Sequence, residues 1–200
     1  MKLTEINLIV PHKNKRFVLA DFDLEHSVKF GYSEGGTVII KATMFKDNSV
    51  IIYALYDKTQ QNFLTSIIGR NYMRNNVKYF LVEDAFTPID KRRQGYASAL
   101  YVSLVSKYHI KLMSGGDHTK YGHRLWLGIS KRIDVKVIDL TTDQIFSKDQ
   151  ISNNDIYILH PEKYRLIAER APNYGIPPFP VDILEDYNIY THSKNTGLYE

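Results

Sequence analysis

Hydrophobic residues in the first half of the chain form short apolar segments separated by turns, which predicts strands. Two such segments, residues 3–10 and 16–22, lie on either side of a basic turn. Thr37–Phe45 and Val50–Tyr56 are separated by a polar four-residue turn and predict a β-hairpin. Asn62–Ile68 is a further candidate strand. No amphipathic helix is indicated before Thr37, so the first half should be a run of antiparallel strands.

The middle of the chain changes pattern and predicts a strand–helix–strand unit. A polar loop at Asn71–Asn76 leads into Lys78–Phe86, whose uninterrupted apolar core is typical of a central strand that ends before Pro88. Ile110–Met113 predicts a second strand, parallel to the first because a helix connects them. The connecting helix carries apolar residues three to four positions apart on one face: Ala97, Leu100, Leu104 and Tyr108.

The last third should close the same sheet. Thr119 or Asp117 can cap a second helix, which carries Tyr121, Leu125 and Ile129 at helical spacing. Val135–Leu140 and Asp155–Leu159 predict a closing hairpin, Pro161–Arg170 has the composition of a helix, and the four prolines of Pro172–Pro180 predict an extended segment. We therefore expect one domain over residues 1–160, with a C-terminal helix, proline-rich segment and tail over 161–200 that pack on it or trail from it.

The amino-acid composition excludes some classes of protein and of functional site but does not identify a single function. A chain of 200 residues with 44% hydrophobic and 24% charged residues is typical of a globular protein. The absence of cysteine excludes disulfides, thiolate metal sites and a cysteine nucleophile. No apolar run is long enough to span a membrane, and the N-terminus lacks the pattern of a secretory signal, so we expect a cytoplasmic protein of a bacterium or an infected host cell, with no membrane partner. A net charge of +4 suits a phosphate, an acidic substrate or a nucleic acid.

The loop between the central strand and the first helix carries the clearest chemistry. A helix N-terminus has free backbone N–H groups and a partial positive charge. Gly95 and Ala97 are small enough for a ligand to approach that backbone, and Arg92 and Arg93 add full charges. Together they predict a cradle for a phosphate or pyrophosphate. The alternative is an ordinary solvated basic loop.

The pattern Arg92-x-x-Gly95-x-Ala97, between an apolar strand and a helix, resembles the acyl-CoA-binding motif of the GNAT acyltransferase superfamily. The resemblance covers about residues 37–160. It implies an α/β (α+β) fold: a mixed, mostly antiparallel sheet with a central βαβ unit and splayed parallel strands. It also implies acetyl-CoA or another acyl-CoA as co-substrate, with the strand before the loop lying against the pantetheine arm. The residues it assigns to the cofactor are Phe86, Arg92, Arg93, Gln94, Gly95, Tyr96, Ala97 and Trp126.

The chain departs from that family at two places. Family members usually begin with one or two helices, so the substrate-side wall here must be built differently. The family's second helix usually runs Asn-x-x-Ala-x-x-Leu-Tyr, and its tyrosine protonates the departing CoA thiolate. Here Trp126, which has no hydroxyl, takes that position, and the Gly-x-x-Leu-Trp pattern resembles divergent phage proteins of GNAT type. The candidate substitute donors are Ser114, Tyr121, His118 and His123.

Acyl transfer to an amine also needs a base and a stabilised oxyanion. Glu83 and Asp84 are the candidate bases, because they interrupt an apolar strand and alternate in direction. Backbone N–H groups at the bulged end of that strand are candidates for the oxyanion. The alternative is that the strand simply ends and both carboxylates face water. His118 and His123 are five residues apart, off the spacing that places two ligands on one helical face, so no metal site is predicted.

The sequence thus predicts an acyl-CoA-dependent N-acyltransferase in which the amine attacks the thioester directly. The acceptor is left open among a small molecule, a protein and a nucleic-acid base, and so is the oligomeric state. One alternative is an inactive binding protein of the same fold, such as a phage structural or host-interaction protein. Another is a GNAT-type enzyme that modifies a nucleic-acid base, using basic clusters at Lys91–Arg93, Lys13–Arg16 and Arg70/Arg74.

Overall fold

A computed structural model describes residues 28–170, apart from residues 33–36, 45, 61, 117–118, 154 and 157–161. The strands expected at residues 3–10 and 16–22 lie outside the described residues. So do the proline-rich segment, the C-terminal tail, and the candidates Asp117 and His118. Of the helices in the described part of the chain, none is long and apolar enough to cross a membrane.

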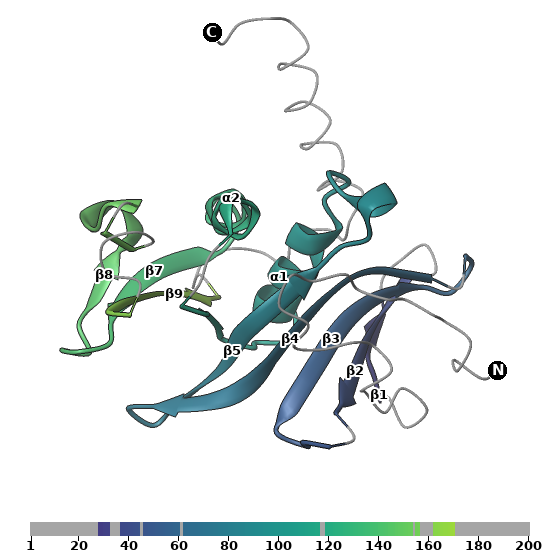
Figure 1. Cartoon of the computed structure of the whole chain (residues 1–200), viewed down its shortest axis with the longest axis horizontal. Coiled ribbons are helices and arrows are strands. Elements are labelled where there is room, and N and C mark those ends of the chain that lie inside the picture. Colours follow the sequence, from purple (N-terminus) through teal and green to yellow (C-terminus); the bar gives the residue numbers. More distant parts are fainter. Residues whose placement is uncertain are drawn as a thin grey trace, which may run out of the picture.

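The described residues form a mixed α+β structure built on one mostly antiparallel sheet (Figure 1). Its nine strands lie in the order β1-β2-β3-β4-β5-β6-β9-β7-β8. The strands are β1 (Val28–Tyr32), β2 (Thr37–Thr43), β3 (Val50–Asp57), β4 (Asn62–Arg74), β5 (Val77–Phe86), β6 (Leu112–Ser114), β7 (Asp134–Asp139), β8 (Ile145–Ser147) and β9 (Tyr164–Glu169). The helices are α1 (Tyr96–Ser106) and α2 (Lys120–Ile129), with short 3-10 turns η4 (Ile89–Lys91) and η5 (Lys148–Gln150).

The first five strands are consecutive antiparallel neighbours. β2 to β5 follow the predicted apolar segments, whereas β1 was not predicted. β3 is buried along nearly its whole length because both of its faces pack. Ile51 and Tyr53 join the core beneath the helices, whereas Val50 and Ile52 join a second cluster on the opposite face. A strand covered on both faces needs a continuous apolar run, which Val50–Tyr56 supplies.

The polar loop expected at Asn71–Asn76 is shorter than predicted. β4 continues to Arg74, which pairs with Val77, so only Asn75 and Asn76 form the turn. Both asparagines have positive φ, 48° and 59°, as a two-residue hairpin turn requires. Asparagine tolerates this conformation better than most residues, and this favours the tight turn. The extra strand length draws β5 alongside β4 over ten residues of β5.

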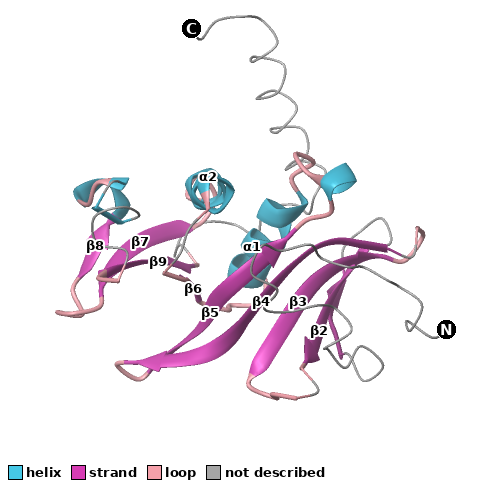
Figure 2. Ribbon diagram, in the orientation of Figure 1, coloured by secondary structure: helices cyan, strands magenta, loops and turns pink. Residues whose placement is uncertain are grey.

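β5, α1 and β6 form the predicted strand–helix–strand unit. β6 runs parallel to β5, with Phe80, Leu81 and Val82 paired to Leu112, Met113 and Ser114. α1 was expected to be amphipathic through to Tyr108, but it ends at Ser106 and every residue from Ala99 to Ser106 is buried. It packs against β3, β4, β9 and α2, so partners surround it (Figure 2). A helix enclosed in this way needs no polar face.

The prediction for the last part of the sheet was wrong in two respects. Residues 161–170 were expected to be helical, but Tyr164–Glu169 is β9, which lies between β6 and β7. Asp155–Leu159 was expected to pair with β7, but Asp155 and Ile156 are helical and the other three residues lie outside the described part. β7 pairs with β8 and β9 instead.

The physical reason for β9 is tertiary. Leu166, Ile167 and Ala168 are all buried, so the segment is covered on both faces as only an inner strand can be. Leucine, alanine and glutamate favour a helix locally, but pairing with two strands satisfies the backbone on both sides and overrides that weak preference. The sheet that was expected to close before residue 160 therefore includes residues 164–169.

Candidate functional site

β5 carries a bulge close to its end. Ile68 of β4 pairs with Asp84, whereas the next residue, Gly69, pairs with Val82, so Glu83 is the extra residue. A Cβ at Gly69 would lie 1.9 Å from the Leu81 carbonyl oxygen, so only glycine lets the two strands approach here. The bulge lies where the sequence analysis placed backbone donors for an oxyanion.

β5 extends beyond its parallel neighbour. The pairing with β6 stops at Val82 and Ser114, and β5 continues to Phe86 (Figure 1). On the side where β6 ends, no strand of the described residues pairs with residues 83–86. Gly115 follows β6, and a Cβ there would lie 2.9 Å from the Val82 carbonyl oxygen. The chain thus passes close to β5 at Val82, directly after the pairing of β5 with β6 ends.

The loop before α1 presents backbone N–H groups at the start of the helix. Gly95 is the N-cap residue and has a left-handed conformation, with φ 78°. Its carbonyl accepts the first helical hydrogen bond, from the Ala99 N–H at 2.9 Å, and no side chain caps the helix. Arg93 also has a positive φ of 63°. Such alternation of backbone conformation turns successive N–H groups inward and is typical of anion-binding loops.

Side chains of the loop hold it in place. Arg92 donates from Nε to the Thr87 carbonyl at 3.1 Å, and Gln94 donates from Nε2 to the Asp90 carbonyl at 2.7 Å. Both bonds tie the loop to the segment containing η4. Arg92 and Arg93 are exposed, so their charges face solvent next to the helix N-terminus.

The loop is also anchored to the sheet. The Phe86 carbonyl, at the end of β5, accepts from the Thr65 hydroxyl of β4 at 2.9 Å, and the Thr65 and Thr87 hydroxyls are hydrogen-bonded at 2.8 Å. Tyr96 packs against the core beneath the helices, and Ala97 is half-buried. The predicted cofactor residues from Phe86 to Ala97 therefore lie on the segment that joins the end of β5 to the start of α1.

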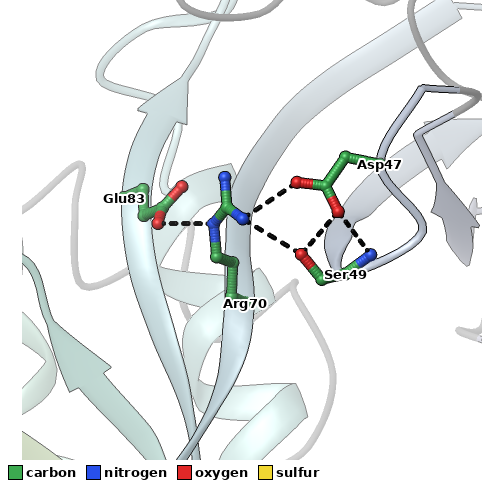
Figure 3. A network of polar contacts seen from close by, with 4 residues as sticks. All are labelled: Asp47, Ser49, Arg70 and Glu83. Carbon is green, nitrogen blue, oxygen red and sulfur yellow. Dashed lines mark hydrogen bonds and ion pairs between the residues drawn. The ribbon is translucent and has the colours of Figure 1, made fainter.

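Glu83 is bound by an arginine from the neighbouring strand (Figure 3). Arg70 of β4 donates from Nε to Glu83 Oε1 at 3.0 Å, and its terminal nitrogen contacts Asp47 at 2.9 Å and the Ser49 hydroxyl at 3.0 Å. The negative charge of Glu83 raises the pKa of Arg70, so this guanidinium stays charged. The network fixes the Glu83 carboxylate, whose side chain is only 22% exposed.

Asp84, the second candidate base, has different surroundings. Its Oδ1 accepts the Ala85 N–H at 2.8 Å, and its charge acts on Tyr101 of α1. The two neighbouring carboxylates thus interact with different elements: Glu83 with β4, and Asp84 with α1. The ion pair between Arg70 and Glu83 is drawn in Figure 3.

Ser114 is buried, and its hydroxyl oxygen accepts the Leu166 N–H of β9 at 2.9 Å. This bond continues the β6–β9 contact just where the backbone pairing of Met113 with Ile167 ends. The geometry gives Ser114 a structural role in the sheet.

We expect Ser114→Ala to lower the free energy of unfolding by about 1–3 kcal/mol, because the buried Leu166 N–H loses its acceptor. Urea denaturation of the two proteins measures this difference. Ser106→Ala, which removes another buried hydroxyl from the end of α1, is the control for loss of a serine from the core. An unchanged unfolding free energy in Ser114→Ala would contradict the structural role.

The remaining candidates on α2 lie apart from one another. Thr119 caps the helix as predicted, accepting the Gly122 N–H at 3.1 Å. Tyr121 is 71% exposed, whereas Trp126 is 2% exposed and belongs to the core. His123 is half-buried, and burial together with the charge of Lys148 lowers its pKa. The described residues contain no group of three histidine, cysteine or acidic side chains that would hold a metal ion.

The sequence analysis missed one residue that the fold brings to this place. Tyr101 of α1 contacts Trp126 edge to face, with ring centroids 5.7 Å apart and planes at 88°. A tyrosine within a run of apolar helix residues gives no signal beyond packing. Its contact with α2 appears only when the elements are assembled.

Two other features do not contribute to this site. A hollow of about 330 Å³ is lined by Ser130, Ile133, Asp134, Val135, Ser147, Lys148 and Asp149, none of which is a predicted site residue. Of the basic clusters considered for nucleic acid, Arg70 is paired with Glu83 and Asp47, and Arg74 with Asp143. Lys13–Arg16 lies outside the described residues.

Comparison with known proteins assigns the chain to no family. No family model matches the chain, and a search of curated proteins gives no match.

Proposed function

We propose that this protein transfers an acetyl or short acyl group from acyl-CoA to an amine. The observation that carries the proposal is a combination of two features. The helix start at Gly95 has no side-chain cap, and the bulged strand β5 extends beyond its parallel neighbour β6. The helix start suits the pyrophosphate of the cofactor. The part of β5 that extends beyond β6, beside which the described residues place no further strand, suits the amide groups of its pantetheine arm, which can bind there as an added strand does.

In the proposed acyl transfer, the groups at the end of β5 act on the amine and the thioester. The amine nitrogen attacks the thioester carbon, the C–N bond forms, and the C–S bond breaks to release CoA thiolate. Glu83 is the base that accepts the proton lost by the amine, and backbone N–H groups at the bulge stabilise the oxyanion. The chain has no cysteine, so direct attack is preferred to an acyl-cysteine intermediate.

A second candidate function has a specific observation in its favour. Trp126 is buried and has no hydroxyl, Tyr121 is exposed, and the Ser114 hydroxyl oxygen has a structural partner in the Leu166 N–H of β9. A protein that kept the fold and cofactor loop but lost catalysis would show these features. It would bind acyl-CoA without transferring the acyl group.

Calorimetry with acetyl-CoA, followed by a colorimetric assay of free thiol with spermidine, kanamycin and a lysine-rich peptide as acceptors, tests both functions. Binding with thiol release that depends on one of the amines supports the acyltransferase. Binding without release from any acceptor favours the inactive binding protein. An absence of acetyl-CoA binding to the folded protein would contradict both.

A further inference from the structure

A hollow of about 330 Å³ lies between the end of α2 and η5, and none of its lining residues belongs to the proposed acyl-CoA site. The lining includes Ser130, which directly follows α2, and Lys148 of η5. Phe146 and Ile151, on either side of η5, pack against the core beneath the helices. η5 and α2 thus stand on the same face of the sheet (Figure 1). A hollow of this volume is within the usual range for a small ligand.

The lining combines an apolar surface with two carboxylates. Ile133 and Val135 are buried, with 3% and 6% of their surface exposed. Asp134 is paired with Lys136 at 2.9 Å, whereas Asp149 is exposed and has no hydrogen bond or ion pair with the described residues. An ionised carboxylate accepts hydrogen bonds and donates none. A ligand that fits this lining therefore has an apolar body and carries N–H donors.

Positive charge lies at the edge of the hollow and along α2. Residues 118–133 contain basic residues and no acidic one, and Arg124 and Lys131 among them are exposed. Lys148 lines the hollow, and its nitrogen donates to the Asn153 side-chain oxygen at 3.2 Å. That partner is neutral, so the lysine charge has no acidic partner among the described residues. A negatively charged ligand complements this edge.

Tyr121 adds an aromatic ring to the outer side of the same helix. It is 71% exposed, although α2 buries another aromatic residue, Trp126, in the core. Tyr121 and Arg124 are three positions apart, so they are neighbours on the helix surface. An exposed ring beside cationic side chains is typical of surfaces on which the bases of single-stranded nucleic acids stack.

We propose that the hollow binds the base of a nucleotide, and that Lys148 and the basic side chains of α2 bind its phosphates. Adenine, guanine and cytosine have planar apolar bodies and exocyclic amino groups whose N–H a carboxylate can accept. The ligand is a free nucleotide or one unit of a single strand, and Tyr121 stacks a further base only in the second case. The inference goes beyond acyl transfer and shares no residue with it.

An acidic peptide fits the same observations less well. A nucleotide has a neutral base at one end and a charged phosphate at the other, so each end meets a different part of the site. An acidic peptide carries negative charge along its length and would bring carboxylates against Asp134 and Asp149, which line the hollow. Like charges at such short range repel each other.

Equilibrium dialysis with cytidine monophosphate and uridine monophosphate tests the contact with the base. The two ligands share sugar and phosphate, but only cytidine has an exocyclic amino group. We expect cytidine monophosphate to bind about tenfold more tightly, the effect of one base-specific contact. Asp149→Ala should remove this preference. Equal affinities of the wild-type protein for the two nucleotides would contradict a base held against Asp149.

Fluorescence anisotropy with a labelled strand of about twelve cytidines tests the surface along α2. Lys148→Ala should raise the Kd for both the strand and cytidine monophosphate about tenfold, because a charge-assisted phosphate contact is lost. Lys78→Ala removes an exposed lysine from β5 and controls for the change in net charge. Tyr121→Ala should weaken the strand about tenfold and leave the mononucleotide unaffected. Low salt, about 50 mM, keeps the phosphate contacts measurable.

The outcomes separate the two sources of the nucleotide. A strand that binds no more tightly than the mononucleotide, with no effect of Tyr121→Ala, identifies the free nucleotide as the ligand. A strand that binds more tightly and is weakened by Tyr121→Ala identifies a single-stranded nucleic acid. A polyglutamate peptide that bound as tightly as the strand would overturn the nucleotide in favour of an acidic protein.

Wild-type affinities in folded Lys148→Ala, or equal losses in Lys78→Ala, would also overturn the site. If Lys148→Ala does not fold, Lys148→Gln is a second uncharged variant for the same comparison. Lys148→Ala should keep the wild-type affinity for acetyl-CoA, because the proposed cofactor site is the loop at Gly95. If neither nucleotide nor strand binds to the wild-type protein, this proposal fails and the proposed acyl transfer is unaffected.

Discussion

Replacing Gly95 with valine is expected to raise the Kd for acetyl-CoA at least about 100-fold. Gly95 has φ 78° at the N-cap of α1, directly before the free N–H groups. A branched side chain there would stand between the backbone and a pyrophosphate. Loss of two charge-assisted hydrogen bonds, each about 1.5–3 kcal/mol, accounts for a change of that size. Calorimetry with acetyl-CoA measures it.

The control for this variant is Gly128→Val on α2. Gly128 is exposed, and a Cβ there meets nothing within 4 Å, so the same substitution should leave acetyl-CoA binding unchanged. Gly95→Val also forces a left-handed conformation on a branched residue, which costs about 1–2 kcal/mol of stability. A melting curve must therefore show that the variant is folded. Wild-type affinity in the folded Gly95→Val protein would show that this helix start does not bind the cofactor.

Arg92→Ala offers an independent test that spares the backbone. It removes one charge beside the helix start, so it should weaken acetyl-CoA binding by about 1.5–3 kcal/mol, roughly 10- to 150-fold. Lys46→Ala removes an exposed positive charge from the β2–β3 turn and controls for the change in net charge. If both variants lost the same affinity for acetyl-CoA, the effect of Arg92 would be general electrostatic attraction and not a specific contact.

Glu83→Gln should lower kcat for the best acceptor amine by about 10²–10⁴-fold, because an amide cannot accept the proton that the amine loses. The Kd for acetyl-CoA should stay the same, since the cofactor loop is untouched. Glutamine keeps an oxygen for the Arg70 Nε, which lies 3.0 Å from Glu83 in the native protein. The Arg70 network should therefore survive, and the comparison isolates the loss of the base.

Asp47→Asn is the matched control for Glu83→Gln. It neutralises the other carboxylate that contacts Arg70, at 2.9 Å, but leaves the Arg70–Glu83 contact in place. The Arg70 and Asp47 side chains are each 40% exposed, so solvent screens this ion pair and it contributes little to stability. We expect an unchanged kcat in Asp47→Asn. If Glu83→Gln also kept the wild-type kcat, Glu83 would serve only to anchor Arg70.

Short-range pattern in the sequence was sufficient to predict β2 to β5 and the central strand–helix–strand unit, although it missed β1. The β2–β3 hairpin, the strand before the Gly95 loop and the parallel pairing of β5 with β6 were predicted correctly, because apolar runs and turn residues act over a few positions. The start of α1 at the Gly95 loop and the Thr119 cap of α2 were also predicted. Each depends on backbone rules that operate within one turn of a helix.

Contacts between residues far apart in the chain determined the rest. β9 is a strand because β6 and β7 enclose it, with Ser114 bonded to Leu166 across 52 positions. The pairing of Glu83 with Arg70, and the contact of Tyr101 with Trp126, likewise join separate elements. Local sequence fixes which elements can form, because propensity and capping act over neighbouring residues. Which side chains then meet at the end of β5 depends on how those elements pack, and no local pattern records that.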